Sequence, residues 1–305
     1  MIALNRLSRA LVHVRRGTLA ERLRCEWLEY RNKGRQLWWQ SQSARHQYIE
    51  ADIQAGVRIR LYFDSCLSYP IYYEDFEWNE LQFIDAFLRP GDVFVDIGAN
   101  IGLFTLVAAH RVRSSGLVHA FEPCSRTFER LLENVSLNKL RNVQCHQLAL
   151  SDTGGEVSMN VSLDGYDAWN SIARPIQGDS FGVETVSCTT WDDFAQNQNL
   201  AGRVTMMKMD VEGWEARVLS GAHQVLSRAD APILQVEFTE LASQSAGSSC
   251  AKTYHVLEEL GYQLFRYDAK SEKLISEPVR EHYTYSNLFA IKDLERVIAR
   301  LERRY

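Results

Sequence analysis

The fold of this chain is decided by the stretch Asp96-Ile97-Gly98-Ala99-Asn100-Ile101-Gly102. It follows the apolar run 93–95, which predicts a buried parallel strand, and it precedes the apolar segment 103–109, which predicts a helix. A strand, a glycine turn and a helix in this order form a nucleotide pocket at the carboxyl edge of a parallel sheet. The glycines allow the chain to reverse tightly and let the backbone approach a ligand closely.

The residues of this turn indicate which ligand the pocket takes. A dinucleotide fingerprint has the spacing G-x-G-x-x-G, but Asn100 stands where the middle glycine would be. The carboxylate of Asp96, two residues before Gly98, disfavours a neighbouring phosphate and favours a cationic amine. S-adenosylmethionine carries an ammonium and a sulfonium and no phosphate, so it is the cofactor that we expect.

A second carboxylate follows the next predicted strand. Segment 116–121 predicts that strand, Glu122 stands at its end and Pro123 stops it. A carboxylate at this place can accept both hydroxyls of a ribose, at about the roughly twenty-residue offset typical of the fold. The alternative is that Glu122 caps a helix starting near Ser125 and that Asp96 is a surface carboxylate.

Length and composition set the class of protein. The chain has 305 residues, of which 46% are hydrophobic and 24% are charged, as in ordinary globular domains. Its six cysteines form no C-x-x-C pair, which favours reduced, buried thiols in a cytoplasmic protein and disfavours a zinc site. No stretch approaches the ~20 apolar residues that span a bilayer.

Charge divides the chain in two. Residues 1–50 hold ten Lys or Arg against four Glu, so the rest carries a net charge of −11, which disfavours nucleic acid as a partner. Residues 1–45 read as helical, either as a cationic helix at a membrane surface or as an extension packed on the main domain or in an oligomer. We prefer the packed extension to the membrane-surface helix, because glutamates in this segment dilute the positive charge that anionic lipid would attract. We expect an N-terminal helical extension at 1–55 and the main domain at 56–305, with its core at 76–291.

Strand and helix patterns alternate along the main domain. This alternation predicts an α/β fold with a mostly parallel sheet and helices on both faces. Two alternating segments, 156–161 and 183–188, predict an inserted antiparallel hairpin with a long connection. The remaining strands are expected at 57–63, 93–98, 117–122, 143–148, 204–211, 233–238, 261–265 and 286–291, and helices at 79–88 and 293–303.

Further carboxylates follow two later strands. Asp210 and Glu212 follow the strand at 204–211, and Glu237 ends the strand at 233–238. Clustered carboxylates repel one another, so they need a cation, a proton or a hydroxyl-rich ligand. A sulfonium cofactor and a sugar-like acceptor rank above a divalent metal because no closely spaced His pair is present, and we assign no metal site. The alternatives are a helix-start carboxylate for Glu212 and a structural acceptor of backbone amides for Glu237.

An alcohol acceptor must lose a proton when it is alkylated, and carboxylates or histidine can take it. Asp210 and Glu237 are the candidate bases, and Glu212 is a third candidate catalytic carboxylate. Acceptor-binding candidates are Tyr166, Trp169 and Asn170 in the insertion 163–181, and His255 on a predicted helix. The alternatives are aromatic side chains that pack a surface loop on the core, and a solvent-exposed histidine.

The combined motifs resemble the FkbM family of S-adenosylmethionine-dependent methyltransferases. The motifs are segments 96–102, 121–123, 148–152 and 208–215, and the resemblance runs from about residue 76 to residue 291. It implies a class I (Rossmann-like) three-layer fold with a seven-stranded sheet whose last strand is antiparallel. It also implies O-methylation of a small-molecule or glycan acceptor, such as a sugar or secondary metabolite.

The resemblance also implies roles for matching residues. The methionine end of the cofactor would contact the glycine turn, its ribose would contact Glu122, and its adenine would contact the segment 151–152. Asp210 and Glu212 would lie beside the reacting centre. The cofactor-binding set is Glu77, Asp96, Gly98, Asn100, Gly102, Glu122, Pro123, Ser151, Asp152 and Asp210. Two other functions stay open, a nicotinamide-dependent oxidoreductase and a non-catalytic scaffold.

Overall fold

The chain contains two compact units, residues 1–48 and 49–305. The computed structural model describes residues 19–53, 56–173 and 180–302. The first unit holds one long helix, α2 (Leu19–Ser43), within the predicted helical extension. The predicted amphipathic pattern of residues 1–18 lies outside the described residues. The predicted boundary after residue 55 differs from the observed one because residues 48–52 form a strand.

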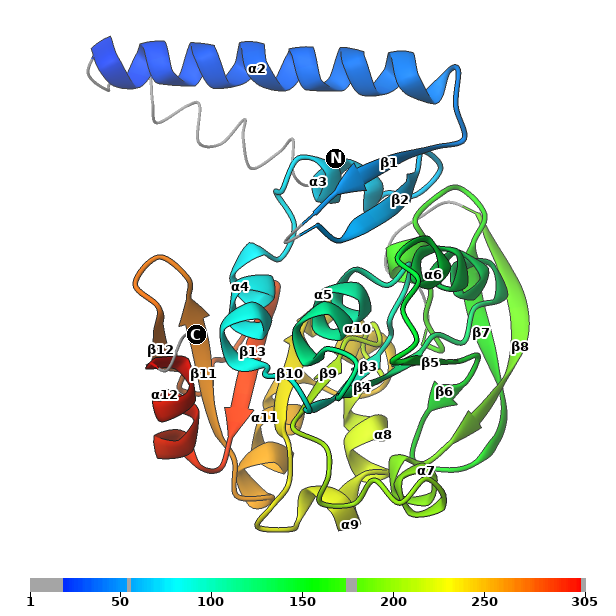
Figure 1. Cartoon of the computed structure of the whole chain (residues 1–305), viewed down its shortest axis with the longest axis vertical. Coiled ribbons are helices and arrows are strands. Elements are labelled where there is room, and N and C mark those ends of the chain that lie inside the picture. The colour runs from blue at the N-terminus through cyan, green and yellow to red at the C-terminus, as the bar shows by residue number, and fades with distance from the viewer. Residues whose placement is uncertain (1–18, 54–55, 174–179, 303–305) are drawn as a thin grey trace. The chain divides into compact units, whose positions relative to one another are not determined.

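An eight-stranded sheet forms the centre of the second unit (Figure 1). Its spatial order is β12 (Lys273–Ser276), β11 (Gln263–Asp268), β13 (Ser286–Ile291), β10 (Ile233–Phe238), β9 (Met206–Met209), β3 (Val93–Ile97), β4 (Leu117–Phe121) and β5 (Val143–His146). The strands from β10 to β5 pair in parallel, and β13 lies antiparallel between β10 and β11. The expected seven strands with an antiparallel last strand are therefore confirmed, and β12 adds an unexpected eighth strand at the edge.

Helices cover both faces of this sheet, which gives the expected three layers (Figure 1). One face packs against α4 (Trp78–Phe87), α5 (Leu103–Val112), α6 (Ser125–Leu137) and α12 (Leu294–Glu302). The other packs against α7 (Trp191–Asn197), α8 (Glu215–Ser220), α9 (His223–Leu226) and α11 (Cys250–Glu259). Two short helices, α3 (Ser68–Tyr72) and α10 (Glu240–Ser245), lie in connections. The central strands are buried on both faces, as expected of a parallel sheet.

The predicted inserted hairpin is confirmed. Strands β7 (Gly155–Ser162) and β8 (Phe181–Thr189) pair antiparallel, and β6 (Ala149–Leu150) pairs in parallel with β8. The connection between β7 and β8 contains a short 3-10 helix, Asp167–Trp169.

Composition-based expectations can also be compared with the structure. The cysteines whose side chains are described, Cys66, Cys124, Cys145, Cys188 and Cys250, carry free thiols. Within the described residues, every helix is too short or too polar to cross a membrane.

A two-stranded hairpin precedes the core, formed by β1 (Tyr48–Asp52) and β2 (Arg58–Tyr62). Side-chain amides of α6 bind the backbone of β2. Asn134, which is fully buried, accepts a hydrogen bond from Arg60 N (2.6 Å) and donates to Ile101 O (2.9 Å). Asn138 accepts a hydrogen bond from Arg58 N (2.8 Å) and donates one to Arg58 O (2.6 Å), both in an exposed setting. These amides join the hairpin to the main domain.

The two asparagines provide a matched test of this junction. Asn134→Ala leaves a buried N–H and a buried carbonyl without partners, so we expect the free energy of unfolding to fall by about 2–4 kcal/mol. Asn138→Ala should cost less than about 1 kcal/mol, because water replaces the amide. Urea unfolding followed by circular dichroism measures both, and equal losses would contradict the assignment.

Candidate functional site

The glycine turn between β3 and α5 is held by the neighbouring strands. Gly98 N and Ala99 N both donate hydrogen bonds to Phe121 O at the end of β4 (3.0 and 2.9 Å). Gly98 has a φ of +78°, and a Cβ there would lie 1.8 Å from the carbonyl oxygen of Asp210. Only glycine fits at this position. The sequence predicted that the glycines let the backbone approach a ligand closely. At Gly98 the backbone instead approaches the end of β9.

The rest of the turn is held locally. Asn100 has a φ of +49°, and its Oδ1 accepts a hydrogen bond from Ile101 N (2.8 Å), a local bond that favours the left-handed conformation. At Gly102, whose φ is +95°, a Cβ would lie 2.6 Å from Leu131 Cδ1 of α6. Gly98 is therefore required by a backbone contact, and Gly102 by its left-handed backbone conformation.

Glu122 lies directly against the turn. Its side chain is buried, and Oε2 accepts a hydrogen bond from Asn100 N (2.9 Å). Its Oε1 accepts bonds from Cys124 N (3.0 Å) and Thr127 Oγ1 (2.7 Å), so the helix-capping alternative holds for this oxygen. Burial raises the pKa of Glu122 to about 7, against the lowering effect of these bonds. A carboxylate has about four acceptor positions, and three of those on Glu122 are filled. Glu122, which precedes Pro123, therefore has room for one further hydrogen bond, whereas two were expected for the two ribose hydroxyls.

Asp96 is fully buried, so it is not a surface carboxylate. Its Oδ2 accepts a hydrogen bond from Thr105 Oγ1 (2.6 Å), and its Oδ1 lies 4.0 Å from Lys208 Nζ without a hydrogen-bond partner in the described structure. Lys208 is also buried, and its Nζ donates to Asp210 Oδ2 (2.9 Å). Sequence analysis missed Lys208, which the register of β3 and β9 places beside Asp96.

Lys208 is a buried cation between carboxylates. Burial lowers its pKa, but the charges of Asp210, Asp96 and Glu77 raise it by more, so the net shift is upward. For Asp96 the two effects have the opposite sign: burial raises the pKa of its carboxyl group, and the charge of Lys208 lowers it. Neither charge could be buried alone without a large desolvation cost. Part of the positive charge that the sequence assigned to the cofactor is therefore supplied by the chain itself.

Removal of this cation tests its role. In Lys208→Met the buried carboxylates lose their counter-charge, so we expect a loss of about 3–5 kcal/mol in the free energy of unfolding near pH 8. Without Lys208 the pKa of Asp96 rises further, and the folded variant then binds a proton that the unfolded chain does not. The deficit should therefore shrink as the pH falls.

Urea titrations at several pH values measure this dependence. The double variant Asp96→Asn/Lys208→Met should recover part of the lost stability, because it removes one of the orphaned charges. A deficit that is independent of pH and of residue 96 would contradict the assignment.

Glu77 approaches the same region from the start of α4. Its Oε1 accepts hydrogen bonds from the Tyr285 hydroxyl and from Asn287 Nδ2 (3.0 Å), while Oε2 is buried without a partner in the described structure. Burial, followed by the charge of Asp210, raises the pKa of Glu77 to about 7. Tyr285 and Asn287 were missed by sequence analysis because they are 208 and 210 residues away from Glu77.

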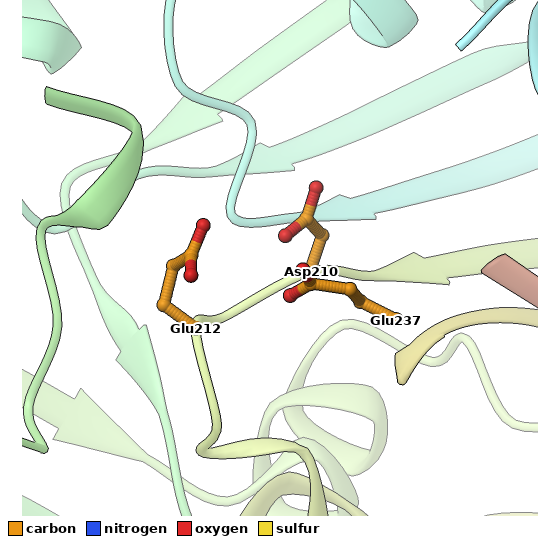
Figure 2. A group of neighbouring side chains, drawn as sticks. All are labelled: Asp210, Glu212 and Glu237. Carbon is orange, nitrogen blue, oxygen red and sulfur yellow. The ribbon is translucent and has the colours of Figure 1, made fainter. Parts of the chain in front are cut away.

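Three predicted catalytic carboxylates lie together at the ends of β9 and β10 (Figure 2). One oxygen each of Asp210, Glu212 and Glu237 lies within 4.8 Å of the others. Glu237 is 5% exposed, and its Oε1 accepts a hydrogen bond from Thr239 Oγ1 (2.8 Å). Burial and the neighbouring carboxylates raise the pKa of Glu212 and of Glu237 well above the usual value. The predicted convergence of these carboxylates is thus what the structure shows.

The two residues predicted near the adenine lie beside the start of α8. Ser151 Oγ accepts a hydrogen bond from Trp214 Nε1 (3.0 Å) and donates to Asp152 Oδ1 (3.0 Å). Asp152 Oδ2 also accepts from Arg217 Nη1 (2.6 Å). These bonds connect the loop after β6 to the loop after β9.

The connection between β7 and β8 contacts two loops of this edge. Asn100 Nδ2 donates to Asp167 O (3.4 Å), and Ser171 Oγ donates to Glu212 O (2.9 Å). Asn170 Oδ1 accepts a hydrogen bond from Ser162 N (2.8 Å), which holds the connection to the end of β7. Sequence analysis missed Asp167 and Ser171.

The aromatic candidates of this connection are only partly buried. Tyr166 is 38% exposed and precedes the 3-10 helix, and Trp169 lies at the end of that helix, half-buried. The structure therefore leaves aromatic surface at this connection. Residues 174–179 of the connection lie outside the described residues.

His255 lies on the exposed side of α11. Its Nδ1 is 3.0 Å from Glu258 Oε2, one turn further along the helix. The exposed position of His255 agrees with the alternative of a solvent-exposed histidine.

Comparison with known proteins identifies the family. Residues 96–264 match the model of the methyltransferase FkbM domain. Methyltransferase 1 of Beauveria bassiana is 30% identical over 189 residues, which cover 57% of this chain and 73% of that protein.

Two further relatives match over shorter shares of their length. The 31-O-demethyl-FK506 methyltransferase FkbM of Streptomyces tacrolimicus is 31% identical over 160 residues, covering 44% of this chain and 60% of the relative. The hexuronic acid methyltransferase AglP of Haloferax volcanii is 27% identical over 145 residues, covering 48% and 56%. The segment that matches the family model contains the glycine turn, Glu122 and the three carboxylates at the ends of β9 and β10. This chain therefore belongs to the FkbM methyltransferase family.

Proposed function

We propose that this protein transfers a methyl group from S-adenosylmethionine to a hydroxyl oxygen of a sugar, a glycan or a secondary metabolite. The observation that carries the proposal is the position of two groups at one edge of the sheet. The glycine turn and Glu122 follow β3 and β4, and the carboxylates of Asp210, Glu212 and Glu237 lie at the ends of β9 and β10. Donor and acceptor can therefore meet between neighbouring strand ends.

The donor half of the site is acidic and suits a cationic, phosphate-free cofactor. Glu122 keeps one acceptor position for a ribose hydroxyl, and Asp210 lies beside the glycine turn through its backbone contact with Gly98. Asp96 acts on the cofactor indirectly, because its carboxylate is fully buried and positions Lys208. This role differs from the direct contact that the family resemblance implies.

The acceptor half contains groups that can take a proton. Displacement at the methyl carbon is in line and expels a neutral thioether, so alignment of donor and acceptor supplies much of the acceleration, up to ~7–11 kcal/mol in favourable systems. The hydroxyl proton passes to a carboxylate during the attack, for which Asp210 and Glu237 are the candidates. The names of two relatives, one acting on 31-O-demethyl-FK506 and one on a hexuronic acid, support a hydroxylated acceptor.

Cofactor binding can be tested without knowing the acceptor. Glu122→Gln removes the charge and one acceptor oxygen, so we expect S-adenosylhomocysteine to bind at least about tenfold more weakly in isothermal titration, equivalent to about 1.4 kcal/mol. Glu184→Gln is the matched control, because Glu184 also binds the start of α6, through Ser125 N (3.1 Å). Thermal melting checks the fold of both variants. Equal affinity in wild type and Glu122→Gln, or tighter binding of NADH than of S-adenosylhomocysteine, would contradict the proposal.

The reaction can be tested with a panel of hydroxylated metabolites, uronic acids and glycans incubated with a methyl-labelled donor. We expect mass spectrometry to find a product carrying one labelled methyl group on oxygen. Asp210→Asn should reduce turnover while S-adenosylhomocysteine still binds, because the loss affects proton transfer. Transfer of the label to nitrogen, carbon or sulfur would contradict O-methylation.

A further inference from the structure

We propose that Asp210, Glu212 and Glu237 form a binding site for a hard divalent cation. Sequence analysis ranked a divalent metal below a sulfonium cofactor and a sugar-like acceptor, because the chain has no closely spaced pair of histidines. Histidine is not required, however, since Mg²⁺, Mn²⁺ and Ca²⁺ prefer carboxylate oxygens. The site is the group of carboxylates drawn in Figure 2.

The spacing of the oxygens suits one shared ion. Three equally spaced ligands of one ion can be separated by at most √3 times the metal–oxygen distance, which is about 4.2 Å for Ca²⁺ and about 3.6 Å for Mg²⁺. One oxygen of each carboxylate lies within 4.8 Å of the other two. Lys208 Nζ contacts Oδ2 of Asp210, so we assign Oδ1 of Asp210 to the cation. Oxygens within 4.8 Å of one another can therefore share one ion after at most a small contraction, which is smaller for Ca²⁺ than for Mg²⁺ or Mn²⁺.

A second observation comes from Glu212, whose Oε2 is buried and has no hydrogen-bond partner in the described structure. Glu237 is only 5% exposed, and its Oε1 accepts a hydrogen bond from Thr239 Oγ1 (2.8 Å). A buried carboxylate oxygen without a partner is costly, and such atoms mark places where an ion or ligand belongs. The hydroxyl of Thr239 fixes the carboxylate of Glu237 as an outer-shell partner fixes a ligand.

The cation that the chain supplies lies on one side of this group. Lys208 Nζ contacts Asp210 Oδ2 and lies 4.0 Å from Asp96 Oδ1. Within the described residues, no ion pair joins a basic side chain to Glu212 or Glu237. A divalent cation would supply positive charge at the place where the three carboxylates are closest.

The site also indicates a class of acceptor, and this step rests on the proposed function. Hard divalent cations take six or more ligands, so three carboxylates leave positions open. Two neighbouring oxygens of one molecule, as in a vicinal diol or a 2-hydroxy acid, can fill two of them. A hydroxyl bound there would lose its proton more easily, and the proton would pass to the oxygen of Asp210 or Glu237 that does not hold the ion.

The test uses the full-length protein, freed of metal with EDTA and dialysed, and each metal chloride alone as the probe. We expect Mn²⁺, followed by electron paramagnetic resonance, and Ca²⁺, followed by calorimetry, to bind one site with a Kd below about 1 mM. Glu237→Gln should weaken binding at least about tenfold. Thr239→Val, which leaves all three carboxylates in place, should weaken it by a smaller factor. Glu258→Gln, an exposed carboxylate on α11, is the control and should bind as wild type does.

Thermal melting provides a readout that does not depend on the spectroscopic signal. Added Ca²⁺ should raise the melting temperature of wild type and of Glu258→Gln, and it should leave that of Glu237→Gln nearly unchanged. Without metal, Glu237→Gln should melt no lower than wild type, because the substitution removes a repelling charge. Circular dichroism confirms that each variant is folded.

Two results would overturn the proposal. One is the absence of saturable binding in wild type up to about 10 mM metal, and the other is binding that is equally tight in Glu237→Gln. The cofactor titration keeps this outcome separate from the proposed function: a protein that binds S-adenosylhomocysteine but no cation retains the function and loses the metal site.

Discussion

Negative charge concentrated at the carboxyl edge of the sheet is the constraint on which the rest of the site depends. Asp96 is fully buried in β3, and its neighbour across the sheet is the ammonium of Lys208 in β9. The same ammonium binds Asp210, so one cation connects the strand that leads into the glycine turn with the loop that carries the other acids. A parallel sheet makes this arrangement possible because neighbouring strands end at the same edge.

The two halves of the proposed site are held differently. The proposed donor half is fixed by backbone bonds from the glycine turn to β4 and by three hydrogen bonds to Glu122. Glu77, a predicted cofactor-binding residue, is instead held by Tyr285 and Asn287, more than 200 residues further along the chain. The connection between β7 and β8 reaches both halves through Asn100 and Ser171. This division suits an enzyme that holds one donor in a fixed position.

The parts of this picture that depend on local pattern could be predicted from the sequence. The glycine turn, Glu122 and the inserted hairpin each follow from residue spacing within one short segment. Lys208 was missed because its role comes from the register between β3 and β9. Strand β1 was missed although residues 49–52 alternate between apolar and polar, because they were included in the N-terminal extension at 1–55. Strand β12 gave no signal because its side chains are mostly exposed.

The contact between Gly98 and the carbonyl oxygen of Asp210 has a consequence for changing what this enzyme accepts. A single added methyl group at residue 98 would force the two strand ends apart, so donor geometry and the acidic loop cannot be altered independently there. The described part of the insertion meets the edge of the sheet through side-chain hydrogen bonds, and its own close backbone contact, at Gly165, is to Asp64 O. Engineering of a new acceptor preference should therefore randomise the insertion outside Gly165 and keep the junction of β3 and β9 constant.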